Sequence, residues 1–261
     1  MASSYNPARE RLAKGELSLG VGLRLVRTGE IAKIMQAAGF DWLWIDLEHG
    51  PLSLDQASQI SLAAIDAGIT PLVRVPEGQF DMATRALDGG AWGIVMPHVD
   101  TAEEAREVVD QLKYPPLGHR SSGGLLPHFG YAAMKGGDAA RLVNEHVLLT
   151  VMVETPKGVA NADAIAAVPG VDVVLIGTGD LTLELGISGE YGDPRVISAY
   201  ETVIAACKKH GKWPGMGGVG SDDYMRRFIG MGMRMILAGG DLNFLLGGAT
   251  RRAQTLRETH K

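Results

Sequence analysis

The sequence predicts a single (β/α)8 TIM barrel, an α/β fold that takes in residues 1–261 as one domain. Short apolar runs rich in β-forming residues recur along the chain, and a segment with helical periodicity follows each of them. The runs are apolar on both faces, which is typical of parallel strands covered by helices. The 35 glycines fall singly or in pairs between apolar segments, where tight corners are needed. Eight such units in about 250 residues match the size of a TIM barrel.

The first half of the chain contains four of these units. Strands are expected at residues 17–25, 42–47, 70–75 and 93–97, and helices at residues 29–38, 53–67, 81–87 and 101–113. Ser53 is a predicted N-cap and Gly68 a predicted helix stop. Thr101 and Glu104 have the spacing of a capping box. Two prolines end the fourth helix, and we expect about thirty irregular residues after them.

The second half contains the other four units. Strands are expected at residues 147–153, 172–176, 212–216 and 234–238, and helices at residues 194–209, 221–230 and 242–258. Thr155 and Pro156 open the helix after the fifth strand as its cap and its first turn. A doubly wound sheet would alternate in the same way, but its Gly-x-Gly-x-x-Gly signature is missing after the first strand. No linker divides the chain, so we expect one domain.

The composition excludes several classes of protein. With 46% hydrophobic residues the chain can bury a large core, so it is not a disordered tail. Its net charge of −5 argues against broad binding to nucleic acid or to anionic membranes. The single cysteine, Cys207, excludes a disulfide scaffold and a Cys-based zinc site. No apolar run is long enough for a membrane span, and the first ten residues lack the apolar stretch of a signal peptide. We therefore expect a soluble cytoplasmic protein.

Polar residues at the carboxyl ends of the predicted strands form the candidate site, because the active sites of barrels lie there. Taken in chain order, they are Asp46, Glu48, His49, Arg74, His98, Glu154 and Asp180. Glu154 and Asp180 offer oxygen ligands to a hard divalent ion such as Mg or Mn. The alternative is that Glu154 pairs with an arginine and that Asp180 only caps a turn.

Two further residues at the strand ends each have two interpretations. Arg74 is a candidate anion clamp, or it pairs with a neighbouring aspartate. His49 is a candidate general base, or a structural histidine. No lysine falls at the carboxyl end of a predicted strand, which argues against covalent imine chemistry. Cys207 lies in a helical segment, which argues against a thiol nucleophile.

Several segments taken together resemble a known family. The segment GFDWLWIDLEHGP at residues 39–51 is similar to a signature of the metal-dependent class II pyruvate aldolases. Further matches follow in order: VRVP at 73–76, VMP at 95–97, YPPLGHR at 114–120, VET at 153–155 and IGTGDL at 176–181. The chain thus resembles the 4-hydroxy-2-oxoheptanedioate aldolase family, which also includes macrophomate synthase. The resemblance covers essentially the whole chain.

The resemblance implies a metal-dependent carbon–carbon lyase. Glu154 and Asp180 would ligate a divalent cation (Mg, Mn or Co), and His49 would be the catalytic base. Asp46 would be the partner of His49. Residues three apart on a regular strand point to opposite faces, so this pairing requires the chain to turn near Glu48.

The resemblance also implies how a substrate is held. Arg74 would bind pyruvate and the enolate oxygen, and the backbone N–H groups of Gly179 and Asp180 would receive the pyruvate carboxylate. The enolate would attack an aldehyde, and the reverse reaction would cleave a 4-hydroxy-2-oxo acid. The implied partners are therefore pyruvate and an aldehyde. Relatives assemble as homo-oligomers, as hexamers built from dimers.

The chain departs from the family pattern at three places. Met152 stands where the family usually has Gln, two residues before the metal-binding Glu. The usual Gly-Pro-x-Asp turn is Gly-Thr-Gly-Asp at residues 177–180. Leu23 matches an aromatic residue that lines the aldehyde pocket of relatives, and Arg24 and Arg27 follow it. We therefore expect a different aldehyde preference, and the two arginines favour an acidic aldehyde.

Two other functions stay open on the sequence. The glycine turns at residues 217–220 and 239–240 could cradle the phosphate of a phosphorylated substrate, or they are merely corners. The chain could also be a non-catalytic protein that binds small acids.

Overall fold

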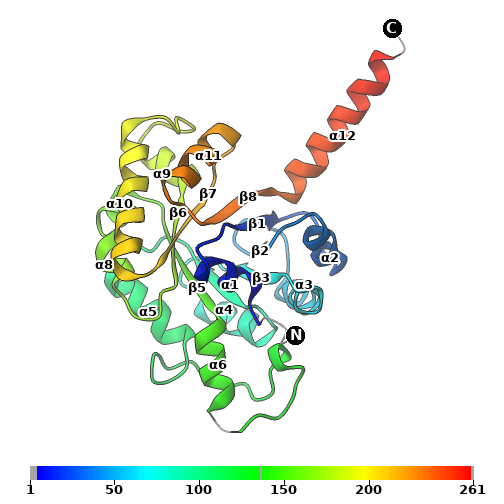
Figure 1. The fold of residues 1–261 in the computed structure, drawn as a ribbon. Helices are drawn as coiled ribbons and strands as arrows, with labels where there is room; N and C mark the ends of the chain where they lie inside the picture. The colour runs from blue at the N-terminus through cyan, green and yellow to red at the C-terminus, as the bar shows by residue number, and fades with distance from the viewer. Residues whose placement is uncertain (1–4, 136, 260–261) are drawn as a thin grey trace.

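The computed structural model describes residues 5–135 and 137–259, and it confirms the TIM barrel (Figure 1). All neighbouring strands pair in parallel and in sequence order, and the last pairs with the first, so that the sheet closes. The strands are β1 (Ser18–Leu23), β2 (Trp42–Asp46), β3 (Thr70–Arg74), β4 (Gly93–Met96), β5 (Leu148–Val153), β6 (Val173–Gly177), β7 (Trp213–Gly217) and β8 (Met235–Gly240).

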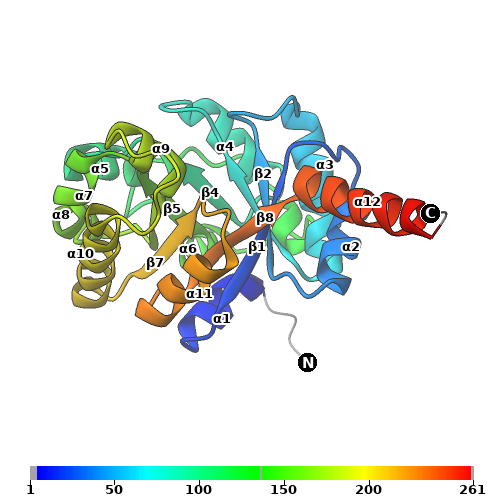
Figure 2. The same cartoon turned by 90° about the horizontal axis from the view of Figure 1, so that it is seen from above.

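Helices follow the strands and surround most of the barrel (Figure 2). They are α1 (Pro7–Ala13), α2 (Glu30–Ala37), α3 (Leu54–Ala67), α4 (Phe80–Asp88), α5 (Ala102–Leu112), α6 (Asp138–His146), α7 (Pro156–Ala160), α8 (Ala162–Ala166), α9 (Thr178–Glu184), α10 (Pro194–His210), α11 (Asp222–Met231) and α12 (Asp241–Glu258), with the 3-10 turn η1 at Pro127–Phe129. The part of the chain that the structure describes holds no helix long and apolar enough to cross a membrane.

The local helix signals in the sequence are confirmed. Ser53 and Gln56 form a capping box at the start of α3, and Gly68 ends that helix with a left-handed φ of 73°. The Thr101 side chain accepts a hydrogen bond from the Glu104 backbone and completes a second capping box, at α5. These caps satisfy backbone N–H groups that the first helical turn leaves without partners, so they fix where each helix begins.

Three helices lie where the sequence suggested none: α1, α6 and α9. The expectation of irregular structure after α5 is wrong for α6, which buries only one side chain fully, Val143. The helix is short and mostly polar, so it has few apolar residues to mark it in the sequence. Helix α1 precedes the first strand and is N-capped by Asn6, whose amide also donates to the carbonyl groups of Trp92 and His146. These bonds hold α1 across the amino-terminal ends of the strands.

Side chains fill the interior of the barrel. Trp42, Trp44, Leu72 and Val95 belong to the inner cluster, and α1 adds Leu12 to it from below. Alternate residues of a strand point to opposite faces, so Asp46 follows the two tryptophans of β2 on the inner face. By the same alternation, the polar residues at the carboxyl ends of the strands point into the opening at that end of the barrel. The lower opening is closed by α1.

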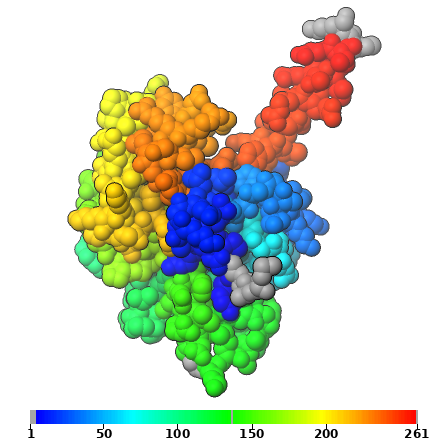
Figure 3. Space-filling model, viewed as in Figure 1, coloured from blue at the N-terminus to red at the C-terminus, as the bar shows by residue number. Residues whose placement is uncertain are grey.

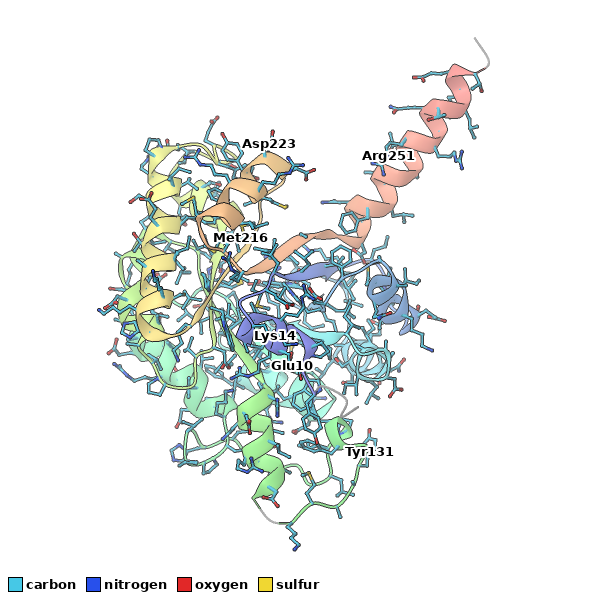
Figure 4. All side chains as sticks on the ribbon, viewed as in Figure 1. Glu10, Lys14, Tyr131, Met216, Asp223 and Arg251 are labelled. Carbon is cyan, nitrogen blue, oxygen red and sulfur yellow. The ribbon has the colours of Figure 1, made fainter. Side chains whose placement is uncertain are left out.

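Helix α12 departs from the barrel instead of covering it (Figures 1 and 2). Its main contacts are with β1 and β8, and it stands clear of the rest of the molecule as a separate rod (Figure 3). Arg251 on α12 lies far from the barrel, whereas Met216 lies on β7 in its wall (Figure 4). The exposed large apolar side chains of α12 are Leu242, Phe244, Leu245, Leu246 and Leu256.

Cys207 lies on α10, in the core between that helix and the barrel. Its side chain is fully buried. Burial raises the pKa of its thiol to about 12, so the thiol stays protonated at neutral pH. The prediction that Cys207 is no nucleophile agrees with this position.

Candidate active site

A cavity of about 420 Å³ opens at the carboxyl ends of the strands. It is the place where barrel enzymes bind their substrates. The residues on its wall include six that the sequence singled out: Arg24, Asp46, His49, Arg74, Glu154 and Asp180. No lysine in the described ranges lines it. The fold thus brings together residues that are up to 156 positions apart in the chain, from Arg24 to Asp180.

Asp46 and Arg74 form a bidentate ion pair at the bottom of the cavity. Arg74 Nε lies 3.0 Å from Asp46 Oδ1, and Nη2 lies 2.6 Å from Oδ2. The guanidinium also lies 5.1 Å above the ring of Trp44. Burial alone would raise the pKa of Asp46, but the hydrogen bonds and charge of Arg74 outweigh it, so this pKa lies below its ordinary value. The pair is therefore charged at neutral pH.

Two more charged side chains complete this network. Arg24 donates from Nε to Asp46 Oδ2 at 2.9 Å, and its side chain is half exposed. Glu48 Oε2 lies 2.9 Å from Arg74 Nη1. Carboxylates thus bind both terminal nitrogens of the Arg74 guanidinium, Nη1 and Nη2, and fix the orientation of this group at the cavity. The sequence left open whether Arg74 pairs with an aspartate or faces a ligand, and the geometry shows both the pair and a place on the cavity wall.

His49 lies on the cavity wall with its side chain half exposed. The chain turns after β2, because the backbone N–H groups of Glu48 and His49 both donate to Asp46 Oδ1. The turn that the sequence required is therefore present. The expected pairing differs, however: the His49 ring lies 3.6 Å from Glu48 Oε2, and no hydrogen bond between residues of the described chain joins it to Asp46. The Asp46 oxygens instead accept hydrogen bonds from Arg74 and Arg24.

Glu154 follows β5 and is almost fully buried. Its carboxylate sits directly against Gly177, where a Cβ atom would stand 2.6 Å from the Cγ of Glu154 and 2.8 Å from its Cδ. The backbone N–H of His98 donates to Glu154 Oε2 at 3.0 Å. Burial raises the pKa of Glu154, and the nearby charge of Asp180 raises it further against the opposing effect of His98.

Asp180 and Gly179 lie in the first turn of α9, and both are exposed to the cavity. The first N–H groups of a helix have no partner within the helix. The turn is anchored from behind by Thr178, whose hydroxyl lies 2.7 Å from that of Tyr200. Free backbone donors and a carboxylate therefore share one corner of the cavity.

The expectation that Leu23 lines the pocket is wrong. Leu23 is fully buried in the cluster between the barrel and its helices. Its neighbours Gly22 and Arg24 line the cavity instead. Alternation along β1 explains this, since residues 22 and 24 share the inner face and residue 23 points outward. Arg27 is exposed and lies outside the lining.

The glycine turns after β7 and β8 also border the cavity. Gly218 has a φ of 79°, and a Cβ atom there would stand 2.7 Å from the backbone N of Gly179. A left-handed conformation and a close approach both favour glycine. This geometry accounts for Gly218 as a corner that lets the turn meet α9.

Two residues of the site had no role assigned from the sequence. His98, after β4, contacts both Glu154 and Glu48. Asp241, at the start of α12, accepts hydrogen bonds from the backbone N–H groups of Leu25 and Val26 and so holds the segment that carries Arg24. Both stand at strand ends in the sequence, which was the available signal, but neither has a diagnostic spacing.

The model of one protein family, HpcH/HpaI aldolase/citrate lyase, matches residues 26–244. The chain belongs to this family. Among HpcH/HpaI relatives, a 4-hydroxy-4-methyl-2-oxoglutarate aldolase of Hapsidospora irregularis is 39% identical over 95% of this chain and 94% of its own length. A hydroxypyruvate/pyruvate aldolase of Cupriavidus necator is 33% identical over 97% of this chain and 93% of its own. The family resemblance seen in the sequence is confirmed, and the chain is a carbon–carbon lyase.

Solved HpcH/HpaI structures agree with this assignment. The family aldolase from Desulfitobacterium hafniense superposes with a TM-score of 0.90 at 32% identity, over 96% of each chain. Macrophomate synthase superposes with a TM-score of 0.79 at 29% identity, over 98% of this chain and 90% of its own.

Proposed function

We propose that this HpcH/HpaI protein is a divalent-metal-dependent aldolase that makes and breaks 4-hydroxy-2-oxo acids through the enolate of pyruvate. The observation that carries the proposal is the cavity itself, which is lined by the carboxylates of Glu154 and Asp180 together with the guanidinium of Arg74 that Asp46 holds in place. The relative from Hapsidospora irregularis is named for a substrate of this class.

The residues present fit a hard divalent cation such as Mg, Mn or Co. Glu154 and Asp180 supply oxygen donors, and Gly177 leaves just enough room for the Glu154 carboxylate. The described residues contain no cluster of three or more metal-binding side chains, so two protein ligands would leave the remaining positions to water and substrate. When bound there, the ion would act as a Lewis acid toward the 2-oxo group of pyruvate.

The protein's own groups would orient pyruvate. The backbone N–H groups of Gly179 and Asp180 would receive its carboxylate, as N–H groups at a helix start receive anions. Arg74 would contact the 2-oxo oxygen and stabilise the negative charge that develops there on enolisation. Because Asp46 and Glu48 hold Arg74 in place beforehand, little rearrangement is needed when the charge forms.

His49 would carry the proton. Its half-exposed imidazole lies on the cavity wall and would take a proton from C3 of pyruvate. Glu48, 3.6 Å from the ring, would orient it and stabilise its protonated form. In the cleavage direction the same imidazole would take the proton of the 4-hydroxyl group as the C3–C4 bond breaks, and would then give it to C3 of the enolate.

Arg24 would select the aldehyde. Its side chain lines the cavity, and only its Nε is engaged by a side chain of the described residues, Asp46. The remaining guanidinium N–H groups suit a carboxylate on the acceptor, because arginine binds carboxylates with paired donors. The substrate named for the Hapsidospora irregularis relative is itself a dicarboxylate. We therefore infer that the acceptor is an acidic aldehyde.

We also infer a homo-oligomer in which α12 packs against a second copy. The exposed apolar side chains Leu242, Leu245 and Leu246 lie on α12, which stands apart from the barrel. Such a row of large apolar residues is typical of a protein–protein contact. Light scattering at micromolar concentration should give a multiple of the chain mass, and a monomer would contradict the inference.

Proton exchange tests the proposed chemistry without any aldehyde. In deuterium oxide, the protein with Mn²⁺ should exchange the methyl protons of pyruvate, as seen by proton NMR. Glu154→Gln should abolish the exchange, and His49→Ala should slow it by about 10² to 10⁴. Exchange that survives removal of the metal by a chelator would overturn the proposal.

A further inference from the structure

His98 makes an unusual set of contacts just after β4. Its backbone N–H donates to Glu154 Oε2 at 3.0 Å, and its ring Nδ1 lies 3.4 Å from the same oxygen. On the other side of the ring, Nε2 lies 3.9 Å from Glu48 Oε1. One residue thus touches two carboxylates that come from the ends of different strands.

The backbone of His98 is held in a conformation that side chains rarely adopt. Its φ is 53°, and within the described ranges only Tyr131 is another non-glycine residue with positive φ. Such strain persists only where the surroundings fix it, and it is common at functional sites. Here the left-handed turn directs the N–H of His98 at Glu154. The strain therefore coincides with the contact.

The other neighbours of Glu154 offer it little polar contact. Met152, two residues earlier on the same inner face, contributes only a thioether to the cavity, and Gly177 contributes no side chain. Among the hydrogen bonds of residues 5–135 and 137–259, the one that Glu154 accepts comes from His98. The orientation of this carboxylate thus depends on His98.

We propose that His98 is a positioning residue that sets the Glu154 carboxylate for cation binding and joins it, through Glu48, to Arg74 and His49. The proposal rests on the cation site inferred above. Residues that hydrogen-bond a metal-binding carboxylate typically change metal affinity by about 10- to 100-fold when removed. His98 does not line the cavity, so it acts through Glu154 and touches neither pyruvate nor aldehyde.

Two substitutions separate the ring from the backbone. His98→Gly keeps the N–H and accepts the left-handed φ without strain, so only the ring is lost. His98→Asn also tolerates this φ, and its amide places a donor near the position of Nδ1. Isothermal titration calorimetry with Mn²⁺ alone, in the absence of substrate, should show about tenfold weaker binding for His98→Gly. His98→Asn should bind within about threefold of the unsubstituted protein.

Thermal unfolding and one further variant distinguish the possible failures. His98→Gly should unfold at or above the temperature of the unsubstituted protein, because glycine relieves the strain; a lower temperature would show a merely structural role and overturn the proposal. Mn²⁺ affinity within twofold of the unsubstituted protein would overturn it as well. Glu154→Gln should abolish Mn²⁺ binding. If it does not, the cation site itself is wrong, whatever His98→Gly shows.

Discussion

Gly177→Ala tests the geometry of the site with one methyl group. Gly177 ends β6 with a φ of −81°, which alanine adopts without strain, so any effect comes from the added Cβ. That atom would stand 2.6 Å from the Cγ of Glu154 and closer still to Oε1. The carboxylate lies between this strand end and His98 and has to move aside.

The size of the effect follows from these distances. Ordinary van der Waals contact begins at 3.4 Å, so the carboxylate must retreat by about 1 Å. A displacement of this size in a reacting group costs about 100-fold in rate. Overpacking of the buried position should in addition lower the free energy of unfolding by about 1–3 kcal/mol.

Aldol cleavage and Mn²⁺ titration measure the two consequences. We expect kcat/KM to fall by about 100-fold and Mn²⁺ affinity to fall with it. Gly230→Ala is the matched control, because Gly230 is exposed on α11 and a Cβ there meets nothing within 4 Å. Gly177→Ala with kcat/KM within threefold of the unsubstituted protein would refute the placement of Glu154 in the catalytic centre.

Three other changes have defined outcomes. Arg74→Lys should lower kcat/KM by about 100-fold, because lysine cannot pair with Asp46 through two prongs and face the cavity as well; steady-state kinetics would show no loss if a point charge is enough. Arg24→Leu should raise KM by about tenfold or more for acidic aldehydes only, and an equal rise for neutral ones would mean that Arg24 is structural. Burial lowers the pKa of His128 from 6.5 to about 4. Its contribution to the free energy of unfolding is therefore complete above pH 6.5. As the pH falls from 6.5 toward 4, that contribution is lost at about 1.4 kcal/mol per pH unit. His128→Gln should flatten that slope in urea unfolding between pH 7 and pH 5, and an unchanged slope would contradict the buried neutral ring.

The sequence predicted the positions of the strands well because their signal is local. Each strand is a continuous apolar run, and the boundaries at Ser53, Gly68 and Thr101 carry capping signals within a few residues. The rule that barrel sites lie at the carboxyl ends of strands then sufficed to select Glu154 and Asp180 for the cavity wall. The positions of the strands and the selection of Glu154 and Asp180 can both be read from the order of residues along the chain.

Contacts between strands could not be predicted in the same way. The partner of Asp46 is Arg74 because β2 and β3 pair with those two residues side by side, and this register is not visible in either segment alone. The prediction that Leu23 lines the pocket was wrong for a related reason. An error of one residue along a strand reverses the face to which a side chain points. The departure of α12 is a third case. A helical pattern shows that a helix forms, but it does not show which surface the helix covers.

Cys207 gives the molecule a built-in reporter. The sequence has one cysteine, and its buried, protonated thiol should react with a thiol reagent only when the region around α10 opens. The same helix carries Tyr200, which anchors the turn before Gly179 at the cavity. A ligand that binds the closed form suppresses opening in proportion to its saturation of the site. If Mn²⁺ or pyruvate binds as proposed, the rate of thiol modification should therefore fall as the site fills, in the absence of any turnover.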